Sequence, residues 1–181
     1  MTRAMSPARM CTSFAAGILF AGAIVCCGTP ARAKDTPAST SGLPVPRYVS
    51  LKSDHINVRV GPTKDNDVAW VYTRAGLPVE VTAEYENWRR VRDSEGAEGW
   101  VYHSMLSGRR TAVVTLKDKD ALAPLYESAS ESSEVAAKLQ AGVVAQVKRC
   151  DISWCRIYGN GFDGWIEKER LWGVYPDEKV N

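Results

Sequence analysis

The chain of 181 residues has few of the residues and motifs on which metal sites and common catalytic sites depend. Its only histidines are His55 and His103, and only Cys150 and Cys155 follow residue 33. A zinc site would need both cysteines and a distant histidine. The chain contains no Gly-x-Ser-x-Gly motif, and we identify no glycine-rich loop in it as phosphate-binding. We therefore expect no metal, no cofactor and no catalytic residue.

The chain also lacks an excess of charge of one sign, with 23 Lys and Arg against 21 Asp and Glu. Three of the basic residues and none of the acids precede residue 34, which leaves 20 basic and 21 acidic residues after it. This near balance argues against a nucleic-acid binder and against a polybasic membrane-surface protein. No apolar run after residue 33 is long enough to span a bilayer. We expect no nucleic-acid partner and no membrane span in the mature chain.

The first 33 residues have the three parts of a secretory signal peptide. The start of the chain carries Arg3 and Arg9 and no acid, residues 11–28 are uncharged and largely apolar, and an Ala-x-Ala sequence ends at Ala33. This pattern predicts cleavage between Ala33 and Lys34. The mature protein is then periplasmic or secreted, in a compartment where disulfides persist.

Two other interpretations of this segment stay open. Its 18 uncharged residues are at the lower limit for a transmembrane helix, so the segment could be kept as an uncleaved anchor. Cys26 or Cys27 could carry a lipid, although neither cysteine directly follows a small residue of the usual kind.

The mature chain begins with a segment that has little to bury. Residues 34–46, KDTPASTSGLPVP, are rich in Pro, Ser, Thr and Gly and are typical of a flexible linker. We expect the folded part to begin near Arg47 and to end near Tyr175, with residues 176–181 as a loose tail.

The folded part contains two copies of one unit, at residues 47–110 and 111–175. Four anchors recur at an offset of 66 residues that falls to 65 across one loop. They are Gly76 and Gly142, Trp88 and Trp154, Gly99-Trp100-Val101 and Gly164-Trp165-Ile166, and Leu106 and Leu171. A period of this length fits a complete small domain in tandem rather than a solenoid.

Each copy is predicted to be all-β. Polar and apolar residues alternate over 55–60 and 79–84, and 143–147 is a short apolar run. Residues 132–141 have apolar side chains at helix-like spacing, but they align with 66–75 of the first copy, so we interpret them as loop and strand. Five or six short strands in about 60 residues make a small barrel.

The first copy carries a recognisable order of motifs: Asn57-Val58-Arg59-Val60-Gly61-Pro62, Gly76 before Val79-Glu80-Val81, then Trp88, then Gly99-Trp100-Val101. This order resembles the bacterial SH3-like (SH3b) domain family. The second copy has Ala123-Pro124-Leu125-Tyr126 in place of the first motif and keeps the later ones. The resemblance covers about residues 47–175 and implies two tandem SH3-like β-barrels.

The resemblance also implies a function, because known members bind cell-wall peptides, target enzymes to the wall or have no assigned role. We therefore expect a non-catalytic exported module that recognises a cell-envelope peptide, peptidoglycan or an envelope protein. A structural or assembly subunit that uses its sheet edges is the alternative. A wall hydrolase or a redox enzyme is a third possibility, for which the sequence offers the least support.

Aromatic side chains near charges are the candidate ligand contacts, because rigid rings give area and charges give orientation. In the first copy they are Tyr72, Tyr85, Trp88, Arg90 and Tyr102. In the second copy they are Tyr126, Trp154, Tyr158 and Trp172. The basic run at 89–92 is either a solvated edge or a small anion site. We expect binding to be concentrated on residues 47–110, with the second copy mainly adding rigidity.

Cys150 and Cys155 lie on either side of a turn between two predicted strands. Opposed residues across a short hairpin can satisfy disulfide geometry. A redox motif needs two intervening residues at a helix N-terminus, whereas four residues on strands intervene here. The spacing therefore predicts a structural disulfide.

Overall fold

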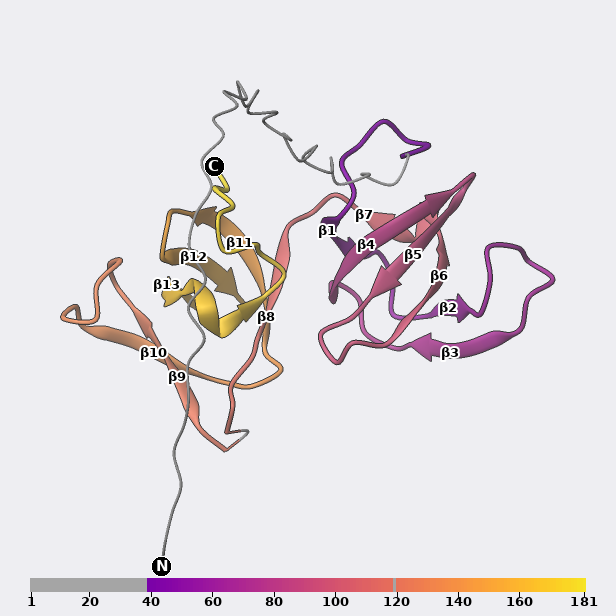
Figure 1. The fold of residues 1–181 in the computed structure, drawn as a ribbon. Helices are drawn as coiled ribbons and strands as arrows, with labels where there is room; N and C mark the ends of the chain where they lie inside the picture. The colour runs from indigo at the N-terminus through magenta and orange to yellow at the C-terminus, as the bar shows by residue number, and fades with distance from the viewer. Residues whose placement is uncertain (1–38, 119) are drawn as a thin grey trace, which may run out of the picture. The chain divides into compact units, whose positions relative to one another are not determined.

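The computed structural model describes residues 39–118 and 120–181 of the chain (Figure 1). The predicted signal peptide at 1–33, its cleavage point and residues 34–38 of the predicted linker lie outside the described residues. The described part is built of strands and two short 3-10 turns, with no α-helix. Within those same ranges, no helix has the length and apolar character needed to cross a bilayer.

The strands form two antiparallel sheets of seven strands each, which we call barrel 1 and barrel 2. Barrel 1 contains β1 (Arg47–Leu51), β2 (Ile56–Arg59), β3 (Val68–Tyr72), β4 (Pro78–Tyr85), β5 (Trp88–Arg92), β6 (Glu98–Tyr102), η1 (His103–Met105) and β7 (Leu106–Ser107). Barrel 2 contains β8 (Thr111–Val114), β9 (Leu122–Tyr126), β10 (Val135–Gln140), β11 (Val144–Cys150), β12 (Trp154–Gly159), β13 (Phe162–Glu167), η2 (Lys168–Arg170) and β14 (Leu171–Trp172).

The two sheets have the same strand order. It is β3-β2-β6-β5-β4-β1-β7 in barrel 1 and β10-β9-β13-β12-β11-β8-β14 in barrel 2, so each strand number rises by seven from one barrel to the next. The prediction of an all-β chain with two tandem small barrels is confirmed. The interpretation of residues 132–141 as loop and strand is also confirmed, because β10 occupies Val135–Gln140.

Each barrel has seven strands, whereas the sequence pattern indicated five or six. The difference includes β7 and β14, which have two residues each and follow the 3-10 turns. They pair with β1 and β8. A two-residue strand is too short to show the period of two from which strands are recognised in a sequence.

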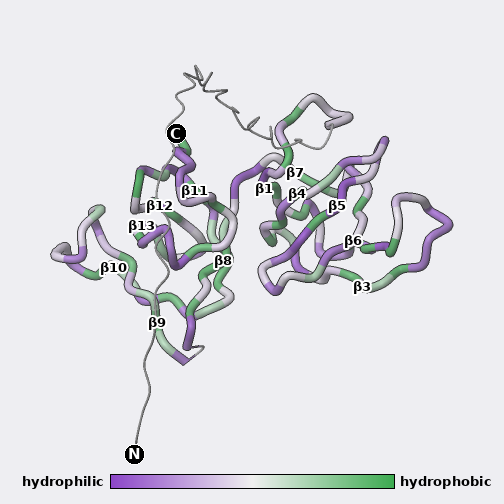
Figure 2. The backbone as a smooth tube through the Cα atoms, viewed as in Figure 1, coloured by the Kyte–Doolittle hydropathy of each residue, from purple (hydrophilic) through white to green (hydrophobic). Residues whose placement is uncertain are grey.

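The alternation of each strand buries one face in a separate core. Barrel 1 buries a cluster that includes Val58, Val79, Val81 and Val101, all with 0% exposure. Barrel 2 buries a cluster that includes Leu125, Cys155, Ile157 and Ile166, also with 0% exposure. Hydrophobic residues accordingly gather in strands such as β8, whereas the loop between β2 and β3 is mostly hydrophilic (Figure 2).

The repeated glycines meet specific demands of the backbone. Gly76 and Gly142 have φ angles of 76° and 82°, which side chains rarely tolerate. Gly99 and Gly164 permit close approach between strands: a Cβ at Gly99 would lie 2.4 Å from Val58 Cγ1, and one at Gly164 would lie 2.7 Å from the carbonyl oxygen of Tyr126. These demands explain why the glycines recur in both copies.

The described end of the predicted linker, residues 39–46, is held against barrel 1. Val45 is buried, with 4% exposure. The backbone N–H and the hydroxyl of Ser41 both donate to Glu84 at 2.8 Å, and Ser39 Oγ donates to the same carboxylate at 3.0 Å. The composition of the segment indicates flexibility, but a buried carboxylate 43 residues further on supplies the acceptors that fix it.

The predicted loose tail at 176–181 is also held in place. Val180 and Cys150 exchange two backbone hydrogen bonds, at 2.8 and 3.2 Å. Glu178 forms an ion pair with Arg110, which also donates to the carbonyl of Gly173. These partners are far away in the sequence, so the local composition of the tail carries no sign of them.

Both barrels fall in one compact unit, and aromatic residues join them. The ring of Tyr48 in β1 lies 4.6 Å from that of Tyr175 and 5.4 Å from that of Trp172, between centroids. The hydroxyl of Tyr175 donates to Glu80 Oε1 at 2.9 Å. Burial, followed by the nearby charge of Glu80, raises the pKa of Tyr48 to about 12. Tyr48 is therefore neutral at pH 7, and Tyr175 supplies a hydrogen bond to the other barrel.

Candidate functional site

A groove of about 400 Å³ opens on barrel 1, between β2, the start of β5, the end of β6 and η1. We call it the Trp88 groove. Its lining consists of His55, Ile56, Asn57, Arg59, Lys64, Trp88, Tyr102, Ser104 and Met105. Its volume is within the range of ligand-binding clefts.

Two aromatic rings form the rigid part of the Trp88 groove. Trp88 and Tyr102 are directly opposed on β5 and β6. Their ring centroids are 5.4 Å apart and their planes meet at 83°, an edge-to-face arrangement. Trp88 is only 8% exposed, so its orientation is fixed by packing. Such a pair offers an apolar contact surface at little cost in side-chain entropy.

Two cations lie beside the rings. Arg59 is the last residue of β2, and its Nη1 donates to the carbonyl oxygen of Asn66 at 2.6 Å. Lys64 is exposed in the loop that follows β2. Neither residue forms an ion pair with another described residue. No Asp or Glu is among the lining residues, so the electrostatic character of the groove is positive.

The structure brings together Trp88 and Tyr102, two of the five residues predicted as ligand contacts in the first copy. Tyr72 lies in the core of barrel 1, where its hydroxyl donates to Asp93 Oδ2 at 3.1 Å. Burial, and then the charge and hydrogen bond of Asp93, raise the pKa of Tyr72. Tyr85 ends β4 and is 51% exposed, but it does not line the groove.

Arg90, the remaining predicted contact, lies outside the groove and in an ion pair. Its Nη2 is 2.7 Å from Glu98 Oε2. Along β5, Arg90 and Arg92 are the more exposed residues, and Arg89 and Val91 are buried. Because Glu80 pairs with Arg92 at 2.5 Å, the basic run is neutralised by neighbouring strands. The solvated-edge interpretation of this run fits the structure better than an open anion site.

The cations of the groove are the contacts that the sequence analysis does not single out. Arg59 stands in the motif Asn57-Val58-Arg59-Val60-Gly61-Pro62, so the motif itself contained the signal. Lys64 has no such signal, because it lies in a loop whose path follows from the pairing of β2 with β3.

The corresponding surface of barrel 2 has different chemistry. Arg59 of barrel 1 pairs with Trp100, and the residue that pairs with the equivalent Trp165 in barrel 2 is Tyr126. Tyr102 of barrel 1 is opposite Trp88, and the residue opposite the equivalent Trp154 is Glu167. A tyrosine therefore replaces the arginine, and an acid replaces the second ring. Tyr126 and Trp154 still form an edge-to-face pair, at 5.5 Å between centroids. At these two positions barrel 2 carries no cation beside the rings.

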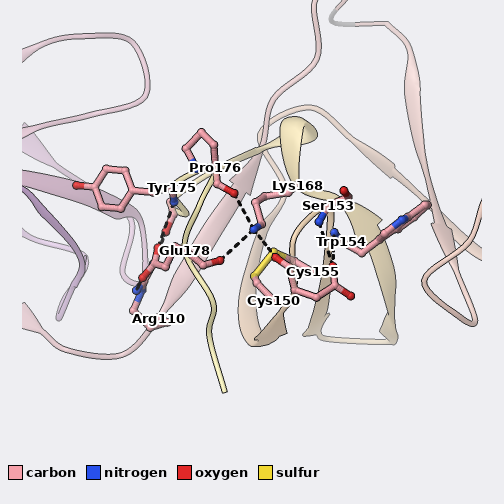
Figure 3. The surroundings of a disulfide bond; sticks show 11 residues. Arg110, Cys150, Ser153, Trp154, Cys155, Lys168, Tyr175, Pro176 and Glu178 are labelled. Atoms are coloured by element: carbon pink, nitrogen blue, oxygen red, sulfur yellow. Dashed lines mark hydrogen bonds and ion pairs between the residues drawn. A yellow bond between two sulfur atoms is a disulfide. The ribbon is translucent and has the colours of Figure 1, made fainter.

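Cys150 and Cys155 form a disulfide between opposed residues of β11 and β12. They are 2% and 0% exposed and belong to the core of barrel 2. Beside them, Lys168 Nζ donates to the carbonyls of Pro176 at 3.0 Å and Glu178 at 2.9 Å, and also to that of Asp151 (Figure 3). The disulfide and this ammonium group fix the C-terminal segment on barrel 2.

Three-residue groups of His, Cys, Asp or Glu that could hold a metal ion are absent from the described ranges, 39–118 and 120–181. Both cysteines in these ranges are in the disulfide, so neither is available as a thiolate nucleophile.

The bacterial SH3 domain matches the chain twice, at residues 52–108 and 119–173. The chain belongs to the bacterial SH3 domain family. Bacterial SH3 domains are generally binding modules, and the tandem match agrees with the two barrels. The disulfide and the domain type fit a protein outside the cytoplasm. No curated protein matches the chain.

Several solved structures are similar to the chain at low identity. NlpC2 from Trichomonas vaginalis has 13% identity over 70% of this chain and 48% of its own, with a TM-score of 0.33. NlpC1 from the same organism has 13% identity over 80% and 51%, with a TM-score of 0.32. An NlpC/P60 family protein from Bacillus cereus ATCC 10987 has 15% identity over 69% and 55%, with a TM-score of 0.29. The chain spans about half the length of these proteins.

Proposed function

We propose that this protein is an exported, non-catalytic binding module whose Trp88 groove holds an acidic peptide segment of the cell envelope. One observation carries the proposal: two fixed aromatic rings lie beside two unpaired cations, and no carboxylate is in the lining. Apolar contact with the rings gives affinity, and the cations select carboxylates and orient the peptide.

The contrast between the barrels supports binding on barrel 1. The backbone topology is the same in both, so the SH3-like fold by itself does not account for the difference in surface charge. Arg59 and Tyr102 stand where barrel 2 has Tyr126 and Glu167. Glu167 is itself paired with Arg170, so this position of barrel 2 offers an acidic peptide neither a second ring nor an unpaired cation.

Export is the second part of the proposal. Residues 1–33 have the pattern of a signal peptide, and the disulfide Cys150–Cys155 is of a kind that persists in the periplasm or outside the cell. Peptides of the cell envelope are then accessible to the mature chain.

The test is a pull-down of the mature chain, residues 34–181, with purified peptidoglycan sacculi. Lys64→Glu and Tyr102→Ala alter the groove, and we expect each to weaken binding about fivefold or more. The loss in Lys64→Glu shrinks as salt rises, because exposed charges are screened. Tyr126→Ala in barrel 2 and Arg90→Ala outside the groove are the matched controls and bind as the unaltered protein does.

Binding that survives both groove substitutions, or that falls equally in Tyr126→Ala, would contradict the assignment to the Trp88 groove. The same incubation tests the non-catalytic part of the proposal, because a wall hydrolase releases soluble fragments from sacculi. We expect no fragments above those released by buffer.

An assembly subunit is the second candidate, and the outer strands favour it. β3 and β10 each end their sheet, and Val68 and Val135 on them are 43% and 48% exposed. Unpaired edges of this kind can accept a strand of another chain. Sedimentation of the mature chain as a concentration-dependent oligomer, without retention on sacculi, would favour this candidate.

A further inference from the structure

A second cavity lies away from the Trp88 groove, where the turn that precedes β4 faces β11 and the β12–β13 hairpin of barrel 2. We call it the junction cleft. Its volume is about 480 Å³, which is larger than the Trp88 groove. Its lining includes Lys52, Arg74, Arg109, Thr111, Gln146 and Asn160.

The charge of the junction cleft is of one sign. Lys52, Arg74 and Arg109 are in its lining, and no Asp or Glu is. None of the three cations forms an ion pair with another residue in the described ranges. Elsewhere on barrel 1, in contrast, the arginines of β5 are paired with acids.

One of these cations has a fixed position. Arg74 Nη1 donates to the carbonyl of Gly142 at 3.0 Å. Gly76 and Gly142 are the equivalent turn glycines of the two copies, so this bond joins the same turn of both barrels. A guanidinium group has further N–H donors after this bond, and these suit the oxygens of a carboxylate or a phosphate.

The neutral residues of the cleft also suit an anion. Thr111 is 4% exposed, and its hydroxyl is buried without a hydrogen-bond partner. An unpartnered buried hydroxyl is costly, so a group that accepts its hydrogen bond would stabilise the site. The hydroxyl of Tyr158 donates to Gln146 Oε1 at 3.0 Å, and this bond orients the side-chain amide of Gln146 within the lining.

We propose that the junction cleft binds a compact oxyanion, such as the carboxylate at the end of a short peptide, through Lys52, Arg74 and Arg109. The site is separate from the Trp88 groove, and no residue lines both. Because the bound anion would contact Arg74 from barrel 1 and Asn160 from barrel 2, it would also favour the arrangement in which the barrels form the cleft.

The test is a titration of the ¹⁵N-labelled mature chain at low ionic strength, followed by NMR chemical shifts. The probes are acetyl-trialanine with a free carboxylate, the same peptide with a C-terminal amide, and inorganic phosphate. We expect the carboxylate peptide to shift the amides of Gly76 and Asn160, and the amide peptide to leave them unchanged. If phosphate competes with the carboxylate peptide, the cleft is a general oxyanion site. If it does not, the cleft requires the end of a peptide.

The decisive variant combines Lys52→Ala, Arg74→Ala and Arg109→Ala, and the matched control combines Lys117→Ala, Lys138→Ala and Lys148→Ala. All six side chains are on exposed residues, and both variants lose the same charge. We expect each cation to contribute a factor of about five or less to carboxylate binding. The junction variant, which lacks all three, should therefore weaken that binding at least tenfold. The control should bind normally.

Equal loss in the two variants would show a non-specific charge effect and overturn the proposal. Binding of the amide peptide as strong as that of the carboxylate peptide, or no shift with any probe, would overturn it as well. Retention on sacculi is measured separately, so failure here leaves the test of the Trp88 groove unaffected.

Discussion

Substitution of Glu84 in β4 is the most direct test of how residues 39–46 pack on barrel 1. Its side chain has no exposed surface, and its carboxylate lies 2.6 Å from Arg47 Nη2 and 3.1 Å from Arg89 Nε. The same carboxylate accepts hydrogen bonds from Ser39 and Ser41. Glu84→Gln keeps the shape and removes the charge, and it leaves two largely buried arginines without their acid.

The loss of stability expected for Glu84→Gln follows from the pKa of the Glu84 carboxyl. Burial alone would raise it, but the hydrogen bonds from Ser41, Arg47 and Ser39 outweigh burial and lower the pKa from 4.5 to about 2. The carboxylate therefore stabilises the folded state above pH 4.5, and this contribution is lost as the pH falls toward 2. The shift corresponds to at most about 3 kcal/mol. Only a thin layer that includes the exposed residues Thr40 and Ser41 separates the carboxylate from solvent, so screening reduces the contribution to about 1–2 kcal/mol.

Because the amide resembles the protonated carboxyl, the counter-charge that Arg47 and Arg89 lose is already part of this shift, so we expect Glu84→Gln to lower the free energy of unfolding by about 1–2 kcal/mol at pH 7. The assay is urea unfolding of the mature chain at pH 7, 4 and 2.5, followed by tryptophan fluorescence. The difference between the variant and the unaltered protein should shrink steadily as the pH falls, because the protonated carboxyl resembles the amide.

The matched control is Asp163→Asn, which removes an exposed ion pair with Arg156 at 2.7 Å. Both side chains of this pair are about 40% exposed, so we expect less than about 0.5 kcal/mol. A Glu84→Gln variant no less stable than Asp163→Asn at pH 7 would refute the reasoning. A loss that is the same at pH 2.5 as at pH 7 would refute the electrostatic part of it.

Three further predictions follow from the disulfide, the buried lysine and the N-terminus. Replacing Cys150 and Cys155 by Ser should cost about 2 kcal/mol and leave retention on sacculi intact, and two free thiols in the exported protein would contradict the bond. Lys168→Met removes the donor to three carbonyls and should cost about 2–4 kcal/mol, with faster amide exchange at Val180; unchanged exchange would show that the tail is held by other contacts. Intact-mass analysis should show a mature chain that begins at Lys34, which a mass with the apolar segment or a lipid adduct would disprove.

The repeat reveals the fold because its anchors are residues for which the backbone leaves few substitutes. Gly99 and Gly164 lie where a Cβ would collide with β2 and β9. Gly76 and Gly142 hold positive φ angles at equivalent turns. Residues with such strict requirements keep their spacing when the rest of a domain diverges, so the tandem barrels can be recognised from the sequence.

The order of residues 39–46 and 176–181 could not be predicted, since long-range contacts hold both segments in place. Residues 39–46 look like a linker because their composition offers nothing to bury, and the acceptor that fixes them is Glu84. The C-terminal segment is held by Cys150, Lys168 and Arg110, all distant in sequence. Local composition reports what a segment can bury by itself and does not report what another part of the barrel offers it.

Only part of the candidate site could be predicted from the sequence. Residue type indicates the chemistry of a side chain, but strand alternation shows only which side chains of one strand share a face, and not whether that face is buried. Trp88 and Tyr102 are opposed across β5 and β6, so both reach the same groove. Tyr72 is also aromatic, but it ends β3 on the buried face, where its hydroxyl donates a hydrogen bond to Asp93. Arg90 has the expected exposure, but Glu98 on the adjacent strand neutralises it.

The two barrels show how one fold carries different surfaces. The topology assigns the same backbone positions to Arg59 and Tyr126, and to Tyr102 and Glu167. Because these side chains stand at the groove and not in the core, they can change without disturbing the packing that the repeated glycines and valines provide. Barrel 2 places its distinctive residues elsewhere, in a disulfide, a buried lysine and a C-terminal segment that reaches Glu80 of barrel 1 through Tyr175. A copy that supplies rigidity and contact surface leaves the other copy free to carry the ligand chemistry, so binding is expected where the positive charge and the two rings coincide.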